Sequence, residues 1–120
     1  MEAATGALFR PLVWLMGIPS AEARSVSQLT GLKTIFNEFV AYLALSRHAG
    51  EASALSPRSL IIATYALCGF AHFGSVAIMI GSIGGIAPER RGDLGRLGLR
   101  SIIAGTIATM LTGCVIGLYV

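Results

Sequence analysis

The sequence predicts an all-α membrane protein that forms a single membrane domain over residues 1–120. The chain is 54% hydrophobic and 12% charged, with a mean hydropathy of +0.74, whereas a soluble domain carries roughly a quarter charged residues. In addition, two long stretches, Ser59 to Pro88 and Ser101 to Val120, contain no aspartate, glutamate, lysine or arginine. The lipid bilayer is therefore the expected surroundings of most of the chain.

The residues before position 32 predict short helices that do not cross the membrane. The apolar stretch 7–18 is interrupted by an arginine, a proline and a glycine, which makes it too short and too broken to span. Pro19 ends this stretch, Ser20 can cap a new helix, and Glu22 lies in its first turn, where the helix dipole favours negative charge. We expect the stretch Ser25 to Gly31 to loosen that helix after one turn.

The next segment, Leu32 to Leu45, carries Lys33, Asn37 and Glu38 among large apolar side chains. Its length of about fourteen residues is typical of a re-entrant or core helix that reaches half the membrane depth. Glu38 is the strongest candidate functional residue, because an ionised carboxylate is costly to bury without a partner. Lys33 is poorly spaced to pair with it on one helix face, and an exposed loop position for Glu38 is the alternative. Asn37, a supporting candidate, either contacts a ligand or caps a half-helix.

The two uncharged stretches predict one broken and one continuous transmembrane helix. Ser56 as a cap and Pro57 at the first helical position indicate where the first of them begins. Ser59 to Pro88 is about ten residues longer than a crossing needs, and its glycines favour an interruption. Ser101 to Val120 rises about 1.5 Å per residue as a helix and so spans the hydrocarbon core of about 30 Å.

A polar stripe follows the broken crossing at helical spacing. Steps of three and four residues place its members on one helix face: Tyr65, Cys68, His72, Ser75, Met79 and Ser82. One interpretation is a buried packing face whose histidine and serine bond to backbone carbonyls. The other is a ligand-facing stripe, in which Gly69 and Gly74 break the helix and release backbone groups that bind a solute or an ion.

Rows of small residues predict close helix packing, within one protomer or between protomers. One row has four members at i,i+4 spacing in the last crossing, and a shorter one has two members. These residues are Gly105, Thr109, Gly113 and Gly117, and then Gly81 and Gly85.

The arginines predict the orientation of the chain. Four of them connect the two uncharged stretches, namely Arg90, Arg91, Arg96 and Arg100. Short cytoplasmic loops collect such residues, so we expect this connection to be cytoplasmic. The basic residues sit beside hydrophobic runs and are not interleaved with aromatic ones, so no nucleic-acid partner is expected.

Neither a metal site nor an enzyme active site is expected. Cys68 and Cys114 have no second cysteine nearby, and the two histidines lie far apart. No Ser/His/Asp arrangement and no glycine-rich phosphate loop followed by lysine can be assembled from the residues present.

Motifs in the chain closely resemble the C-terminal region of concentrative nucleoside transporters, the ion-coupled nucleoside symporters. They are Asn37-Glu-Phe-Val-Ala-Tyr42, Leu55-Ser-Pro-Arg-Ser59, Ala63-Thr-Tyr-Ala-Leu-Cys-Gly-Phe-Ala71 and Ala87-Pro-Glu-Arg-Arg-Gly-Asp-Leu94. The resemblance covers about Phe9 to the C-terminus, but only the last part of such a transporter. It implies that Pro19 to Leu45 is the second re-entrant hairpin, Ser59 to Pro88 the broken crossing beside the substrate, and Ser101 to Val120 the final crossing.

The resemblance also implies roles for individual residues. Glu38 corresponds to the glutamate that hydrogen-bonds the ribose hydroxyls, Phe70 to a phenylalanine near the base, and Ser75 to a serine on the ribose. His72 stands where the family usually has an asparagine that serves the ribose as amide donor and acceptor, and an imidazole reproduces only part of that chemistry. Other departures from the family pattern are Leu60, Met79 and Ser20, where glutamate, glutamine and tryptophan are common.

The function expected from this resemblance is cation-coupled nucleoside symport, with this chain as the substrate-contacting C-terminal part. The coupling cation, sodium or a proton, belongs to the intact transporter and its site is not expected in this chain; no other cofactor is expected. The expected partners are a nucleoside, the lipid bilayer, and the missing N-terminal part or further copies of the chain. The expected location is the plasma membrane, as a multi-pass protein of the bacterial inner membrane. The alternative is a small non-transporting membrane protein, or a truncated relic, that packs against another membrane subunit through its glycine rows.

Overall fold

The computed structural model describes residues 2–48 and 55–120, with side chains from residue 6 onward. Every element in these ranges is helical, which confirms the predicted all-α class. The elements are α1 (Glu2–Leu15), α2 (Ser20–Ile35), α3 (Glu38–His48), α4 (Pro57–Leu67), α5 (Phe73–Ile86), a short 3₁₀ helix η1 (Pro88–Arg90) and α6 (Arg91–Tyr119).

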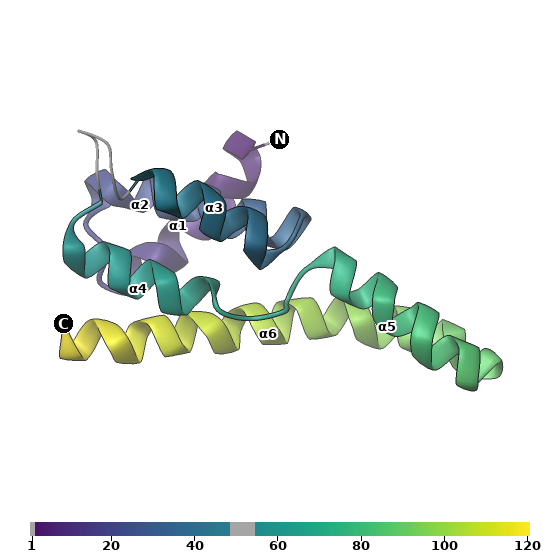
Figure 1. Cartoon of the computed structure of the whole chain (residues 1–120). Helices are drawn as coiled ribbons and strands as arrows, with labels where there is room; N and C mark the ends of the chain where they lie inside the picture. The colour runs from purple at the N-terminus through teal and green to yellow at the C-terminus, as the bar shows by residue number, and fades with distance from the viewer. Residues whose placement is uncertain (1, 49–54) are drawn as a thin grey trace.

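The long helix α6 organises the molecule (Figure 1). α4 lies along its C-terminal half and α5 along its N-terminal half, while α1, α2 and α3 pack on the α4 side. The chain therefore forms an elongated molecule with extents of 51 × 25 × 23 Å. Its hydrophobic core lies mainly among α1, α2, α3 and α4, and Met110 of α6 joins it.

The α1–α2 connection is set by one glycine. α1 ends at Leu15, and Gly17 follows with a φ of 86°, a left-handed conformation that glycine adopts without a steric penalty. Pro19 ends the preceding stretch, as the sequence predicts. Ser20, however, is the first residue of α2 and not its cap; the N-cap is Pro19, which makes no side-chain cap hydrogen bond. The turn brings α2 back against α1.

Helix α2 does not loosen after its first turn, so the prediction for Ser25 to Gly31 is wrong. The hydroxyl of Ser27 donates to the carbonyl of Arg24 at 2.8 Å, and that of Thr30 donates to the carbonyl of Val26 at 2.9 Å. These hydroxyls bond back to carbonyls of their own helix, so their hydrogen-bonding capacity is used without leaving the helical conformation. Burial of Val26 in the core then holds the polar stretch as a helix.

The segment Leu32 to Leu45 is also not one helix. It breaks at Phe36 and Asn37, and the chain reverses there, so α2 and α3 form a helical hairpin (Figure 1).

Helix α4 begins where the sequence predicts. Pro57 is its first residue, and the Ser56 hydroxyl accepts a hydrogen bond from the backbone N–H of Ser59 at 3.3 Å. The stretch from Ser59 to Pro88 is interrupted at residues 68–72, between α4 and α5. Because of this interruption, the polar stripe from Tyr65 to Ser82 does not share one helix face, contrary to the prediction from spacing.

Helix α6 begins at Arg91, earlier than the predicted Ser101. Val76 of α5 packs where a side chain at Gly98 would be, so the arginine-rich stretch is held as a helix against α5. Within the described residues, the continuous stretch Pro88–Tyr119 is the one helical segment long and apolar enough to cross a membrane, judged by length and composition. Gly6–Leu15 and Phe73–Ile86 are shorter apolar helices.

The glycine row in α6 packs within the chain. A Cβ at Gly105 would lie 2.9 Å from Cβ of Ala71, and one at Gly113 would lie 2.7 Å from Sδ of Met16. At Gly117 it would lie 2.6 Å from the carbonyl oxygen of Met16. The row therefore lets α4, the 68–72 connection and the α1–α2 turn approach the backbone of α6 closely.

Candidate functional site

The break between α2 and α3 places Glu38 at the start of a helix. The Asn37 side chain accepts a hydrogen bond from the backbone N–H of Val40 at 2.9 Å, so Asn37 caps α3. Glu38 is the first residue of α3, and its side chain is half-buried. Of the two roles open to Asn37 from the sequence, the structure shows the cap.

His72 and Ser75 cap the start of α5, at the end of the break between α4 and α5. His72 has extended backbone angles and is the N-cap of α5; its Nδ1 accepts from the backbone N–H of Ser75 at 3.1 Å. The Ser75 hydroxyl lies 3.5 Å from the backbone N–H of His72, which completes a capping box. The same hydroxyl lies 2.6 Å from the carbonyl of Phe70 and 2.7 Å from that of His72. Ser75 thus holds the turn that precedes α5.

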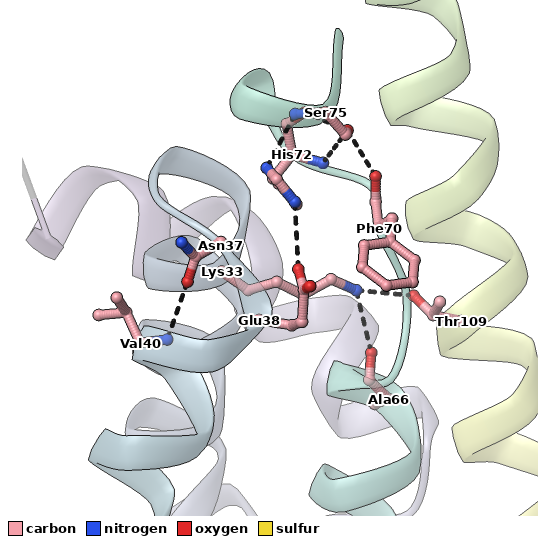
Figure 2. A network of polar contacts seen from close by, with 9 residues as sticks. All are labelled: Lys33, Asn37, Glu38, Val40, Ala66, Phe70, His72, Ser75 and Thr109. Carbon is pink, nitrogen blue, oxygen red and sulfur yellow. Dashed lines mark hydrogen bonds and ion pairs between the residues drawn. The ribbon is translucent and has the colours of Figure 1, made fainter. Parts of the chain in front are cut away.

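The two breaks meet at the side chains of Glu38 and His72 (Figure 2). Nε2 of His72 lies 3.1 Å from Oε2 of Glu38, although the two residues belong to separate helical pairs. Oε2 is buried and makes no hydrogen bond of normal geometry among the described residues. A carboxylate with open acceptor sites therefore lies where two helix ends converge.

Lys33 lies beside this contact and was weighed from the sequence only as a poorly spaced partner of Glu38. Its side chain is only 1% exposed, and its Nζ donates to the carbonyl oxygen of Ala66 at 3.3 Å and to Oγ1 of Thr109 at 3.2 Å (Figure 2). The ammonium group joins α2, the end of α4 and α6. The signal was present in the sequence, because a lysine in an apolar segment meets the same criterion that selected Glu38.

Gly69 allows the connection between α4 and α5 to approach α6 closely. A side chain there would collide with Cγ2 of Thr109 and would lie 3.9 Å from Nζ of Lys33. The connection between α4 and α5 therefore runs directly against α6, as a residue without a side chain permits.

Phe70 and Ser75 also border a cavity of about 370 Å³ on the α6 side of the connection. Its other lining residues include Gly105 and Thr109. Phe70 is 77% exposed, so its ring is free to contact a bound molecule or another segment. The structure thus brings Glu38, His72 and Ser75 into one connected cluster, with Phe70 next to it.

The described residues contain no group of three or more histidine, cysteine, aspartate or glutamate side chains that could hold a metal ion. Cys68 and Cys114 are both free thiols.

Comparison with known proteins decides the family. The family model described as "Na+ dependent nucleoside transporter C-terminus" matches residues 1–117. The chain belongs to this nucleoside transporter family. The resemblance inferred from the motifs is thereby confirmed.

Similar proteins of this family come from bacteria and vertebrates. The uncharacterized transporter YutK of Bacillus subtilis is 42% identical over 120 residues, which is 100% of this chain and 29% of YutK. The putative nucleoside permease NupX of Escherichia coli is 36% identical, again over 100% of this chain and 29% of NupX. Human solute carrier family 28 member 3 is 42% identical over 92% of this chain and 18% of its own length. These relatives are named as a transporter, a permease and a solute carrier, in agreement with the prediction that the chain is not an enzyme.

Solved structures of the transporter CNTnw have the same fold. In its inward-facing substrate-bound state, CNTnw matches with a TM-score of 0.90 and 38% identity, over 99% of this chain and 30% of CNTnw. An outward-facing variant also gives a TM-score of 0.90, at 37% identity. The chain thus spans less than a third of the length of the relatives described here.

Proposed function

We propose that this member of the nucleoside transporter family is the substrate-contacting C-terminal part of a cation-coupled nucleoside symporter, and that Glu38 binds the ribose. The proposal rests on one observation: the Glu38 carboxylate lies at the junction of two helix breaks and is only half-buried, so that a solute can reach it. A carboxylate accepts hydrogen bonds from vicinal hydroxyls, and such charge-assisted bonds are about twice as strong as neutral ones. Phe70 supplies an exposed aromatic surface next to it for the base.

The helix lengths support the proposed membrane arrangement. α2 and α3 are the re-entrant hairpin, α4 and α5 the two halves of a broken crossing, and α6 the final crossing. Helix breaks at membrane depth are tolerated where they are buried in protein or line a cavity, and both breaks here meet other helices of the chain. We infer a multi-pass protein of the bacterial inner membrane, in which the coupling cation, sodium or a proton, binds to the rest of the transporter.

Uptake by a chimera tests the proposal. This chain would replace the matching segment of CNTnw, and uptake of labelled uridine and adenosine into proteoliposomes would be measured. We expect saturable uptake, and at least a tenfold loss of it with Glu38→Gln, which keeps the shape of the side chain but removes its charge. Glu89→Gln, in the exposed helix η1, is the matched control and should leave uptake unchanged. Equal uptake by the unmodified chimera and Glu38→Gln would rule out Glu38 as the ribose ligand.

One observation favours the alternative of a non-transporting partner protein. A Cβ at Gly81 or Gly85 would meet nothing within 4 Å, so the short glycine row on α5 is open for another helix. Substituting both with leucine separates the two functions: a pairing protein would lose its partner in a detergent pull-down, whereas the symporter chimera would keep its affinity for nucleoside.

A further inference from the structure

Both ring nitrogens of His72 have an assigned neighbour. Nδ1 accepts the backbone N–H of Ser75 and so carries no proton. A neutral imidazole then has its proton on Nε2, and Nε2 is the atom that lies 3.1 Å from Oε2 of Glu38. The cap and the carboxylate thus favour the same tautomer.

We infer that His72 is a positioning residue: it uses Nδ1 to cap α5 and its single Nε2–H to hold Oε2 of Glu38, which leaves Oε1 for the nucleoside. This inference rests on the proposed function and refines it, because His72 then acts on the ribose through Glu38 and not by direct contact. Oε2 is buried and has no other hydrogen-bond partner among the described residues, so the nearby Nε2–H of His72 is the donor available to it. His72 also links the two helix breaks, so that the start of α5 and the start of α3 are set by one imidazole.

The burial of the two side chains agrees with these roles, because the histidine is more enclosed than the glutamate. The His72 side chain is 8% exposed, whereas that of Glu38 is 23% exposed. The ring is enclosed further by the α5 backbone, because a Cβ at Gly74 would lie only 3.1 Å from Nδ1. A solute can reach Glu38 without displacing the histidine.

In the part of the chain that the structure describes, no basic side chain other than His72 lies within ion-pair distance of this carboxylate. Lys33 is the nearby cation on α2, and its ammonium group is directed to Ala66 and Thr109. Among the described residues, the ion-pair contact of Glu38 is the one with His72.

The other histidine of the chain provides an internal contrast. Nδ1 of His48 lies 3.0 Å from the carbonyl oxygen of Ala44. A carbonyl oxygen only accepts, so Nδ1 of His48 must carry a proton. The two histidines are therefore expected to differ in which nitrogen is protonated.

The first experiment reads these protons directly and does not depend on transport. The 120-residue chain with ¹⁵N-labelled histidine would be placed in lipid nanodiscs, and its imidazole nitrogen signals assigned with His48→Gln. We expect a protonated Nε2 and a bare Nδ1 at His72, and a protonated Nδ1 at His48. A protonated Nδ1 at His72, as the other tautomer or as the cation, would overturn the inference.

The second experiment is a double-mutant cycle on the KM for uridine uptake by the chimera. His72→Ser keeps an N-cap hydroxyl for α5 but removes the group that faces Glu38. We expect this change to raise KM about tenfold with an unchanged maximal rate, since hydrogen bonds to charged groups are strong. Added to Glu38→Gln, it should raise KM no further, because the two residues act as one unit.

The result of the cycle separates positioning from direct contact. Multiplicative effects of the two substitutions would show that His72 binds the ribose independently, against the inference. His72→Asn, which keeps both a cap acceptor and a donor, should restore part of the affinity. If the chimera takes up no nucleoside at all, the proposed function fails, whereas the histidine signals still decide whether His72 holds Glu38 in this way.

Discussion

Two regions of the molecule use similar apolar helices in opposite ways. The body consists of α1–α4 with the C-terminal half of α6, and the arm consists of α5 with the N-terminal half of α6 (Figure 1). In the body, Val13, Ile62 and Leu67 are completely buried. In the arm, Ile78 is 71% exposed and Ile86 86% exposed.

The glycine rows show the same difference, although Gly84 and Gly98 pack at the contact between α5 and α6 within the arm. In the body, Gly113 and Gly117 of α6 are approached closely by Met16, whereas Gly81 and Gly85 of the arm have open space around them.

Thus the body has a buried apolar core within the chain, although Leu8, Trp14 and Phe39 on its surface are exposed, whereas most large apolar side chains of the arm are exposed. The site lies at the boundary, where the body contributes Glu38 and the first turn of the arm contributes His72.

The largest expected effect comes from adding a side chain on the packed glycine row. Gly113→Leu would collide with Sδ of Met16 at 2.7 Å and Cβ of Ala66 at 3.2 Å. We expect a loss of about 3 kcal/mol in the free energy of unfolding, which is typical of overpacking. Titration with sodium dodecyl sulfate, followed by helical circular dichroism in mild detergent, measures it.

The matched substitution in the arm is Gly85→Leu. A Cβ at this position meets no atom within 4 Å, and leucine is a better helix former than glycine, so the free energy of unfolding should change by less than about 1 kcal/mol. Similar losses for both leucines would break the distinction between body and arm. Gly113→Ala adds only the Cβ and should fall between the two.

Arginines donate to backbone carbonyls in both regions, Arg91 to Gly84 in the arm and Arg58 to several carbonyls in the body. Arg58 of α4 donates from its guanidinium to the carbonyls of Gly17, Gly117 and Val120, the last through Nε at 2.9 Å. It therefore holds the α1–α2 turn and the end of α6 together. Arg58→Met should lower the free energy of unfolding by about 2 kcal/mol, because hydrogen bonds from a charged group are lost at several carbonyls.

Thermal unfolding with Trp14 fluorescence as the probe follows the α1 side of the body and checks the Arg58 prediction. Arg96→Met in the exposed arm is the control. An unchanged melting temperature for Arg58→Met would mean that the turn and the C-terminal end are held by packing alone.

The sequence predicted those parts of the fold that depend on local chemistry or on run length. Ser56 and Pro57 mark the start of α4 because capping is local. The interruption at 68–72 followed from an uncharged run too long for one crossing. The continuity of α2 was missed because burial against α1 overrides the weak propensity of its polar residues.

The candidate site was predicted as a set of residues but not as a geometry. Glu38 could be selected because a buried carboxylate needs a partner. Its contact with His72 depends on how the α2–α3 hairpin packs against the break between α4 and α5, and no local rule sets the distance between the two side chains. For the same reason the partners of Lys33, a carbonyl on α4 and a hydroxyl on α6, could not be read from the sequence.

The smallest expected effect concerns the one purely exposed ion pair of the arm within the described residues. Arg90 and Asp93 lie 3.0 Å apart with side chains 69% and 58% exposed. Such pairs contribute about 0.5 kcal/mol and are screened by salt. Asp93→Asn should therefore shift the unfolding midpoint slightly at low salt and not measurably at high salt. A larger loss that persists in high salt would mean that Asp93 stabilises the start of α6 by more than an exposed, screened ion pair.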